Sequence, residues 1–404
     1  TADAQESLAR LVHRSLVVPL GPARPGGRSR FAQLATVRGH AAHTAGAGSA
    51  ALLDSRDQRI AELVGAQPRL GGADEPAWFA AVDDDLAALR ATLQRNLVEA
   101  PSPLGVGIAA RLGLHWYYHG MMVEARLWQE RATAVAAGVG AEPFDRAMAH
   151  FMLGGSLIMA HRADLGVPHV RAGWEAVRGT PADRTVPLGD GLTVLSGAFF
   201  TAGQAEFSRR IAARIRTIAT VSADPALDLF AELAALLALA HDADPARVAD
   251  AAEAVYALAA GASNTYAAWQ SCGAGAVAAL AGGDVAGALR WSDRMVAQHL
   301  AMGVGEGPML LELRADAVAL TGDAPAAVRL YAAAQAHHRR AGIRWPTREV
   351  TTELMRGATE ALDRVEFEQA WQEGTRLTLA ELGAAPAAAP DPASAAALAQ
   401  PAPA

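Results

Sequence analysis

Lysine is missing from this chain of 404 residues, so all 35 of its Lys and Arg positions are arginine. A Walker-type phosphate loop requires Gly-Lys-Ser/Thr and a Schiff-base enzyme requires a lysine amine, so both are excluded here. Aromatic residues make up only 5% of the chain. The single cysteine, Cys272, excludes an internal disulfide and favours a reducing compartment. We expect Cys272 to be a small buried core residue and not a reactive thiol.

Positive charge is also in short supply, because 42 acidic residues outnumber the basic ones and the net charge is −7. Surfaces that bind nucleic acid are normally basic, so we predict no direct contact with nucleic acid. No uninterrupted apolar run reaches about 18 residues, which predicts no membrane span. The N-terminus lacks the charged and apolar regions of a signal peptide. We therefore expect a cytoplasmic protein, and one that is a piece of a longer chain because its first residue is not methionine.

Alanine, in contrast, is abundant and accounts for roughly a quarter of the residues. Alanine has the highest intrinsic helix propensity, whereas strands favour β-branched and aromatic residues. The composition therefore predicts an all-α protein.

A short motif recurs about every 40 residues along most of the chain. The segment AGGDVAGALRW at 281–291 resembles LTGDAPAAVRL at 320–330, and weaker copies precede them. The turn of each copy is marked by one residue, and the markers are Gly120, His161, Gly203, His241, Gly283 and Gly322.

Each copy has the composition of a helical hairpin. Glycine at the turn accepts the left-handed conformation that ends a helix, and a small alanine in the second helix lets two helices approach closely. These alanines are Ala125, Ala288 and Ala327. A single hairpin cannot bury its apolar face alone, so neighbouring hairpins must stack. We predict a tetratricopeptide-like α-solenoid of about six hairpins, with the best-matching repeat around Trp116.

The spacing of these features divides the chain into five parts. Residues 1–44 have the helix, strand, turn, strand, helix order found at the end of a winged-helix module, and residues 45–98 are predicted to form two connecting helices, the second at 76–97. The repeats occupy 99–342, and two short capping helices are expected within 343–383. The Ala/Pro-rich end, 384–404, is predicted to be disordered.

Several of these segments resemble AfsR-type (SARP) and large LuxR-type bacterial transcriptional regulators. RFAQLATVRGHA is similar to the element that follows their ATPase module, and WYYHGMMVEARLWQERA to their first repeat. Their Trp-…-Asn-Leu-Arg-Ala-Ala-Leu helix is matched at Trp78, Asp85, Leu89, Arg90 and Leu93, with Ala88 in place of the usual Asn. Their closing repeat and cap are matched at Tyr331, Trp371, Gly374 and Leu379.

The resemblance implies a regulatory sensor fragment. Such regulators join a DNA-binding domain and a STAND-type ATPase to a tetratricopeptide-like sensor, and neither of these modules is found in this chain. ATP is therefore expected only in the missing ATPase module, and no cofactor is predicted here. The implied partners are those two modules and a small-molecule or peptide effector. Exposed helical faces are also compatible with a homodimer.

The clearest chemical motif is a histidine pair, His115 and His119, whose spacing can present two imidazoles to one metal ion. The sequence places no carboxylate beside them and lacks the glutamate of an HExxH motif. We therefore interpret both as packing or hydrogen-bonding residues and assign no metal site. The run 83–85 is interpreted as the solvated face of a helix. No serine nucleophile motif occurs, so no catalytic residue is assigned.

Effector binding is predicted in the concave groove, on the first helix of each hairpin. The predicted groove is aromatic at its start and acidic toward its end, which suits an amphipathic molecule or a peptide with one cationic end. Alanine substitution of Tyr117 or Phe200 is expected to weaken binding without unfolding the chain. The predicted groove residues are Tyr117, Tyr118, Phe151, Met159, Thr193, Phe200, Thr201, Asp228, Gln270, Glu312 and Asp316.

These expectations favour a non-catalytic, effector-sensing domain of a transcriptional regulator, and two alternatives stay open. The first is an adaptor for protein–protein interaction, in which the groove holds only a peptide. The second is an α/α enzyme with an acidic cleft built from Asp228, Glu312 or Asp316. Ligand-dependent compaction would favour the sensor, whereas turnover abolished by one carboxylate substitution would favour the enzyme.

Overall fold

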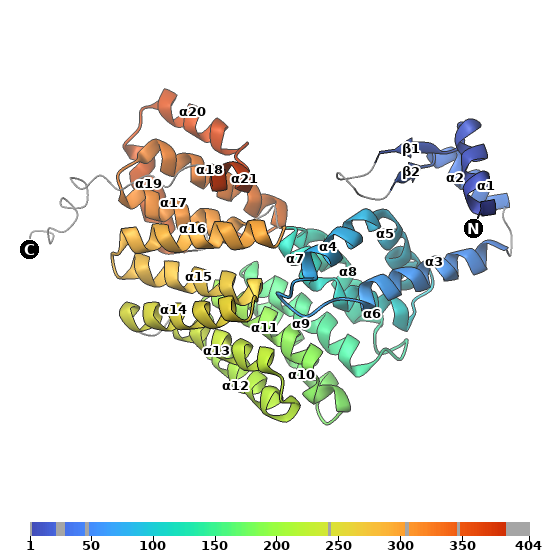
Figure 1. The fold of residues 1–404 in the computed structure, drawn as a ribbon, viewed down its shortest axis with the longest axis horizontal. Coiled ribbons are helices and arrows are strands. Elements are labelled where there is room, and N and C mark those ends of the chain that lie inside the picture. Colours follow the sequence, from blue (N-terminus) through green and yellow to red (C-terminus); the bar gives the residue numbers. More distant parts are fainter. Residues whose placement is uncertain are drawn as a thin grey trace, which may run out of the picture.

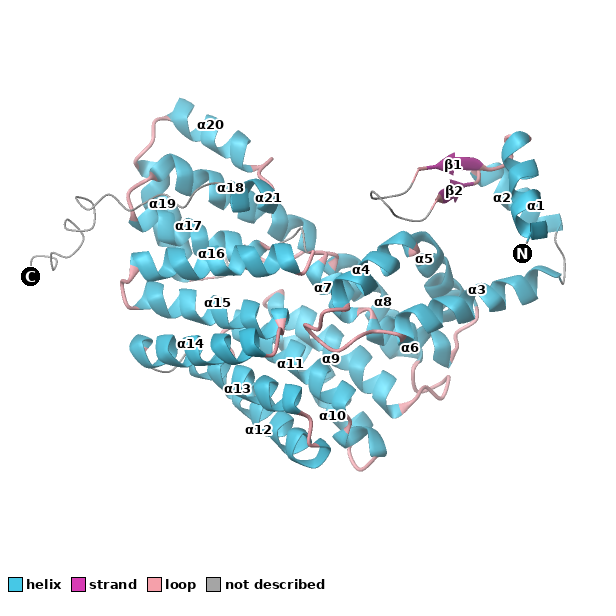
Figure 2. Cartoon of the chain, viewed as in Figure 1, coloured by secondary structure: helices cyan, strands magenta, loops and turns pink. Residues whose placement is uncertain are grey.

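The computed structural model describes residues 2–21, 29–44, 48–240, 244–303, 307–345 and 348–384. These residues are almost entirely α-helical, with one pair of very short strands (Figure 2), so the all-α prediction is confirmed. Within the described ranges, no helix is both long and apolar enough to cross a membrane. The predicted disordered tail lies outside these ranges, apart from its first residue.

The N-terminal unit, residues 2–44, is a helix, two strands and a second helix at one end of the molecule (Figure 1). Its elements are α1 (Ala2–His13), β1 (Val18–Leu20), β2 (Arg30–Ala32) and α2 (Ala35–Thr44). The strands pair antiparallel, with Val18 opposite Ala32. This element order is the one expected from the sequence, and the Gly/Pro-rich bend at 22–28 lies outside the described residues. None of the described side chains of the unit is buried.

Three helices and one π-helical turn connect this unit to the repeats. They are α3 (Gly48–Gly65), α4 (Glu75–Asp84), α5 (Leu86–Gln94) and η1 (Arg95–Glu99). The prediction of a single helix over 76–97 is therefore wrong, because the helix is interrupted at Asp85 and forms α4 and α5. Asp85 leaves helical geometry with φ −104° and ψ 9°, and Arg59 of α3 holds its carboxylate at 2.9 Å.

The repeat region is a series of antiparallel helical hairpins followed by three short helices. Its helices are α6 (Pro103–Arg111), α7 (Gly113–Tyr118), α8 (Met122–Val135), α9 (Pro143–Met159), α10 (Ala163–Val177), α11 (Val186–Thr201), α12 (Ala205–Ser222), α13 (Pro225–Leu239), α14 (Pro245–Gly261), α15 (Thr265–Ala281), α16 (Val285–Ala301), α17 (Pro308–Leu320), α18 (Ala324–Ala341), α19 (Glu349–Glu360), α20 (Arg364–Gly374) and α21 (Leu379–Ala384), with a 3₁₀ turn η2 (Pro181–Arg184) before α11. Two capping helices are predicted within 343–383, whereas the described residues there form three, α19, α20 and α21. A capping box of Asp363 and Glu366 starts α20.

Helix pairs flank each of the turn markers. Gly283 and Gly322 adopt φ of 74° and 85°, the left-handed region that glycine enters without steric strain. His161 occupies the same conformation with φ 58°, which is unusual for a residue with a side chain. His241 belongs to a segment between α13 and α14 that lies outside the described residues. Local helix-ending chemistry therefore sets the hairpin boundaries.

The first helices of successive hairpins, α9, α11, α13, α15 and α17, pack against one another, and each second helix packs on its own partner (Figure 1). Small residues allow this close packing. Ala125, Ala288 and Ala327 are buried as predicted, and a Cβ on Gly275 of α15 would lie 2.4 Å from the Trp291 ring of α16. The core therefore runs continuously through the hairpins.

The end of the array returns to its beginning. Helix α18 contacts α8, and a second apolar cluster joins Met122, Met159 and Ala198 to Ala341 at the end of α18. A Cβ on Gly342 would lie only 2.8 Å from the side chain of Val123. The hairpins consequently enclose an interior instead of leaving an open groove along one side.

Candidate functional site

The interior is crossed by the loop between α3 and α4, residues 66–74, which we call the connecting loop. Arg69 reaches two first helices at once, because its guanidinium pairs with Asp190 of α11 at 2.8 Å and with Asp224 before α13 at 2.7 Å. The carbonyl oxygen of Leu70 accepts a hydrogen bond of 2.8 Å from the Asn264 side chain, which caps α15. The loop therefore lies across the N-terminal ends of α11, α13 and α15.

Glycine is required where this loop makes its closest approach. Gly71 has φ 69°, and a Cβ there would lie 2.4 Å from Asn264 Oδ1 and 2.7 Å from the Tyr266 backbone nitrogen. The Gly71 carbonyl accepts a hydrogen bond of 3.0 Å from the Thr265 backbone N–H. Its own N–H donates to the carboxylate of Glu75, the first residue of α4, at 3.2 Å. No other residue could occupy this position without moving the loop away from α15.

Glu75 is a buried acidic residue at the start of α4, with only 1% of its surface exposed. Burial raises its pKa to about 8, although the hydrogen bond from Gly71 acts in the opposite direction. Its second oxygen, Oε2, is buried without a hydrogen-bond partner among the described residues. A carboxyl group in such a place is held in its protonated form near neutral pH.

A cavity of about 420 Å³ lies between the connecting loop and the array, and we call it the junction pocket. Its volume falls within the range of roughly 300–1,000 Å³ that is typical of small-molecule sites. The loop contributes Gln67, Arg69 and Leu70. The array contributes a mainly apolar wall with a few polar groups, from Arg111, Leu114, Phe144, Met148, Met152, Asp190 and Val194.

Arg111 is fixed at the edge of this pocket. Its guanidinium pairs with Asp145 at 2.6 Å and lies 5.5 Å from the centre of the Phe144 ring. Asp145 is mostly buried, and burial raises its pKa despite this ion pair. The pocket thus combines an apolar wall with two anchored guanidinium groups, the arrangement that recognises an apolar molecule carrying a polar or anionic group.

Four of the predicted groove residues meet around a smaller central cavity of about 50 Å³. Tyr117, Tyr118, Met159 and Thr201 line it. Residues of the later hairpins complete its wall, namely Trp269, His299, Met309, Leu310, His338, Ala341 and Ile343. A cavity of this size has room for a few water molecules. It lies where the first and last hairpins meet.

The next predicted residues are packed into the interior. Phe151 is fully buried against Trp174, and Phe200 is 3% exposed. Gln270 donates to the Tyr266 hydroxyl at 2.9 Å, and that hydroxyl donates to the carbonyl of Thr193 at 3.4 Å. The groove is filled here because α15 and α11 touch directly. Phe200→Ala would therefore leave a cavity and destabilise the fold, contrary to the expectation from sequence.

The predicted acidic residues do not share one surface. Asp228 is exposed on α13, whereas Glu312 and Asp316 of α17 are buried. Arg348 pairs with both buried carboxylates, and Thr351 donates to Asp316 at 2.8 Å. Burial raises the pKa of Asp316 to about 6, while Arg348 acts in the opposite direction. These acids join α17 to the segment before α19 instead of facing an open groove.

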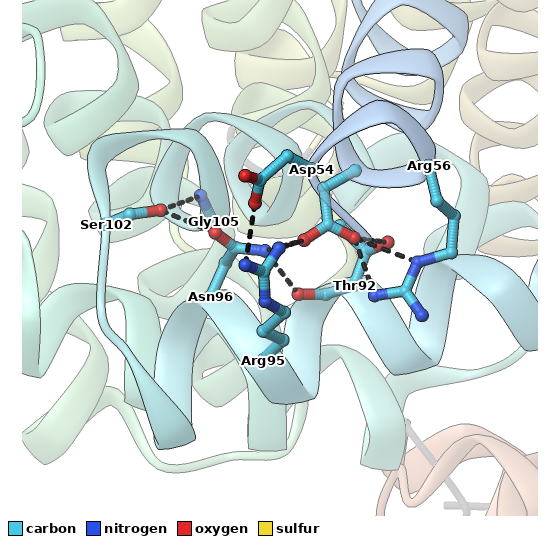
Figure 3. A network of polar contacts seen from close by, with 8 residues as sticks. Asp54, Arg56, Thr92, Arg95, Asn96, Ser102 and Gly105 are labelled. Atoms are coloured by element: carbon cyan, nitrogen blue, oxygen red, sulfur yellow. Dashed lines mark hydrogen bonds and ion pairs between the residues drawn. The ribbon is translucent and has the colours of Figure 1, made fainter. Parts of the chain in front are cut away.

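A polar network joins the connecting helices α3, α5 and η1 to one another and, through Ser102, to the start of α6 (Figure 3). The Asp57 carboxylate accepts hydrogen bonds from Thr92 at 2.7 Å, Arg95 at 2.6 Å and Asn96 at 2.7 Å. Burial would raise its pKa, but these bonds and one from Arg56 keep the pKa below its usual value. These bonds hold the connecting helices together, and the same helices share one apolar core with the array.

A third cavity, of about 580 Å³, lies between the second helices α10 and α12 on the outside of the array. Its floor is apolar and its rim carries four arginines, Arg171, Arg178, Arg210 and Arg214. Arg214 pairs with Asp183 and Arg210 with Glu206, while Arg171 and Arg178 have no ion-pair partner in the described part of the chain. We call this the arginine groove.

Sequence reasoning did not find the junction pocket or the arginine groove. The only local signal for the first is the Gly/Pro-containing stretch GAQPRLGGADEP at 65–76, in which one arginine and one buried glutamate are enclosed by turn residues. No protein-family model, curated protein or solved structure matches this chain. Its function therefore has to be argued from these cavities and contacts.

Proposed function

We propose that the chain is the non-catalytic, effector-sensing part of a bacterial transcriptional regulator of the AfsR or large LuxR type. Its hairpins would form a tetratricopeptide-like solenoid, and its N-terminal unit would be the end of a winged helix. The proposal is supported by the order of hairpins around the turn markers and by the strand pair at Val18 and Ala32. Both accord with the resemblance of the sequence to these regulators.

The observation that carries this proposal is the position of the junction pocket. Its wall is shared between the connecting loop, which leads from α3 and the N-terminal unit, and the first helices α9 and α11. A molecule bound there contacts both parts at once. It can shift the docking of the loop only if it has a different affinity for the docked and released states. Arg69, which borders the pocket and fixes the loop, is the residue where such a difference would arise.

The expected effector is a small, mainly apolar molecule with one polar or anionic group. The methionines of α9 provide an adaptable apolar surface, and Arg111 and Arg69 provide cationic donors. The central cavity is a second place where a ligand could bind if the cavity widened. Tyr117 and Met159 of the first hairpins meet Ile343, which follows α18, at this cavity. Tyr117 is half-buried, so it is the better of the two predicted probes for that cavity.

The test uses the full chain and a panel of apolar carboxylic acids. Binding is detected by thermal shift, confirmed by calorimetry, and located by hydrogen exchange in residues 66–74. Ala182→Trp, at the pocket edge, should abolish both binding and the change in exchange. Ala213→Trp, on the exposed face of α12, is the matched control and should change neither. Binding that persists in Ala182→Trp, or that leaves exchange in the loop unchanged, would contradict the proposal.

A second candidate function, a protein-interaction adaptor, is favoured by the arginine groove. Its four arginines surround Trp174, Phe199 and Phe207 in a chain that is acidic overall. By charge complementarity the occupant would be an acidic amphipathic helix of a partner protein, with apolar residues on the floor and carboxylates on the rim. Such a partner would be bound outside the array, so the two functions differ in location.

Fluorescence anisotropy with a labelled acidic amphipathic peptide tests the adaptor function. Reversing two rim charges, Arg171→Glu with Arg178→Glu, should abolish binding of this peptide. Arg247→Glu on α14, an exposed arginine outside the groove, is the control and should retain it. Equal loss in both variants would show binding governed by overall charge and would remove this candidate.

A further inference from the structure

A cluster of potential metal ligands joins α4 to α7. Asp83 lies in the last turn of α4, His115 lies in α7, and His119 directly follows α7. One ligand atom from each residue lies within 4.8 Å of the other two. His115 Nε2 is 2.8 Å from Asp83 Oδ1, and His119 Nδ1 is 3.9 Å from Asp83 Oδ2. The structure thus supplies the carboxylate that the sequence could not place beside the histidine pair.

Aromatic packing sets the positions of these side chains. The two imidazole rings are stacked, with centroids 4.4 Å apart, because they are separated by one helical turn. The Phe79 ring, one turn before Asp83 on α4, lies 6.0 Å from the His115 ring and 5.6 Å from the His119 ring. Phe79 also meets Tyr118 edge to face at 5.3 Å. The cluster is therefore assembled by the same packing that seats α4 on α7.

We propose that Asp83, His115 and His119 form a site for a divalent transition-metal ion of the Zn²⁺ class. Two imidazole nitrogens and one carboxylate oxygen are donors that Zn²⁺ prefers, whereas Ca²⁺ and Mg²⁺ take oxygen donors. Ligand atoms of a tetrahedral Zn²⁺ site lie about 3.3 Å apart. In this structure the three ligand atoms lie within 4.8 Å of one another, so the side chains would have to draw together to bind the ion.

The exposure of the three side chains also suits a metal site. The side chain of Asp83 is 42% exposed and that of His119 is 22% exposed, while His115 is fully enclosed. The ion would thus enter from the Asp83 side and leave a water-accessible fourth position. The Nδ1 atom of His115 is buried and has no hydrogen-bond partner among the described residues. The Nε2 atom of the same ring is the one that faces Asp83 and would bind the ion.

The consequence of the site would be structural. One ligand comes from the connecting helix α4 and two come from the first hairpin, so the ion would fasten these elements together. This site does not depend on the proposed effector function, because it uses no residue of the junction pocket.

The test is Zn²⁺ titration of the full chain after treatment with a chelator. Calorimetry should give one bound ion per chain, and Mg²⁺ should give no binding. Asp83→Asn keeps the side-chain shape and can still bond to His115, so it should fold normally. Its affinity for Zn²⁺ should fall by about tenfold or more, as should that of His119→Gln. Co²⁺ should give a visible ligand-field spectrum that Asp83→Asn weakens.

The matched control is another close histidine pair, on α9 and α10. His150 and His169 place their Nδ1 atoms 3.0 Å apart and belong to no three-residue ligand cluster in the described part of the chain. His150→Gln with His169→Gln should leave Zn²⁺ binding unchanged. Absence of Zn²⁺ binding by the unaltered chain would overturn the proposal. Full affinity in a folded Asp83→Asn variant, or an equal loss in the control, would also overturn it.

Discussion

The N-terminal unit and the helical array both contain large apolar residues, but these residues are exposed in the N-terminal unit and buried in the array. Within residues 2–44 no described side chain is buried, and Val18, Phe31 and Leu34 are 45%, 43% and 59% exposed. In the array, each hairpin contributes residues to one continuous core. The comparison shows that local pattern is enough to form helices and strands, whereas burial requires a neighbouring surface.

The difference in burial arises because, within the described residues, the N-terminal unit has no neighbouring element to cover its apolar side chains, whereas each hairpin of the array does. A single two-stranded hairpin is marginally stable in water, and two flanking helices do not cover both of its faces. Each repeat hairpin is equally unable to bury its apolar face alone, but it has neighbours on both sides. Exposed apolar residues that cluster on such a unit mark a surface for a partner.

The largest expected difference comes from removing a phenylalanine ring in each region. Phe230 of α13 is fully buried, so Phe230→Ala should destabilise the chain by about 3–5 kcal/mol through loss of burial and an unfilled cavity. Phe31→Ala in β2 should change stability by about 0.5 kcal/mol or less, because its ring is already near water. Urea denaturation followed by circular dichroism measures both, and similar losses would contradict the comparison.

A second difference concerns titratable groups, since the array interior encloses Glu75 and the N-terminal unit has no buried group among its described residues. The pKa of Glu75 is raised from 4.5 to about 8 in the folded chain. The folded state thus keeps a proton that the unfolded state releases. Stability should therefore fall as the pH rises from about 4.5 to 8, by a few kcal/mol, and then level off.

Glu75→Gln separates this effect from the other titrating groups. Glutamine stays neutral and can still accept the hydrogen bond from Gly71. Above pH 8 this variant should be more stable than the unaltered chain, and the difference should shrink as the pH is lowered toward 4.5. Denaturant midpoints of the variant and of the unaltered chain, measured across that pH range, give this difference in stability. A constant difference at all pH values would show that Glu75 is ionised in the folded chain.

A third difference comes from glycines inside helices. A Cβ on Gly166 of α10 would lie 2.6 Å from the Gly154 carbonyl oxygen of α9, so Gly166→Ala should separate two helices and destabilise the array by about 1–3 kcal/mol. Gly39 of α2 has open space around it, so Gly39→Ala should instead stabilise its helix by about 0.5–1 kcal/mol. Thermal melts measure the first, and hydrogen exchange in α2 the second. Effects of the same sign would contradict the packing described here.

These contrasts also explain what could be predicted from the sequence. Hairpin boundaries depend on neighbouring residues, and Gly283 with Asp284 identifies its turn because glycine accepts φ 74° and aspartate caps the next helix. The all-α composition is likewise a local property. The N-terminal strand pair was predicted from local sequence as well, from the order of helix, strand, turn, strand and helix around a Gly/Pro-rich bend.

The candidate site could not be predicted, because it is made by contacts between distant residues. Arg69 and Asp190 are 121 residues apart, and no spacing along the chain links them. The same holds for Asp83 and His115, separated by 32 residues. A groove was expected from the first helices alone, but α11 and α15 contact each other there. The connecting loop, which crosses the N-terminal ends of these helices, has no helical pattern. Tyr117, Met159 and Thr201, which were predicted from the repeat register, nevertheless line one cavity.

The smallest expected effect comes from an exposed ion pair that joins connecting helix α5 to α8. Arg90 bonds both oxygens of Glu124 at 2.7 Å and 2.6 Å, but its side chain is 47% exposed. Arg90→Gln should therefore cost about 0.2–1 kcal/mol, and 1 M salt should largely remove the difference. Denaturation at two salt concentrations tests this. A larger, salt-independent loss would mean that Arg90 and Glu124 support the packing of α5 on α8, and that they do not act as an ion pair screened by solvent.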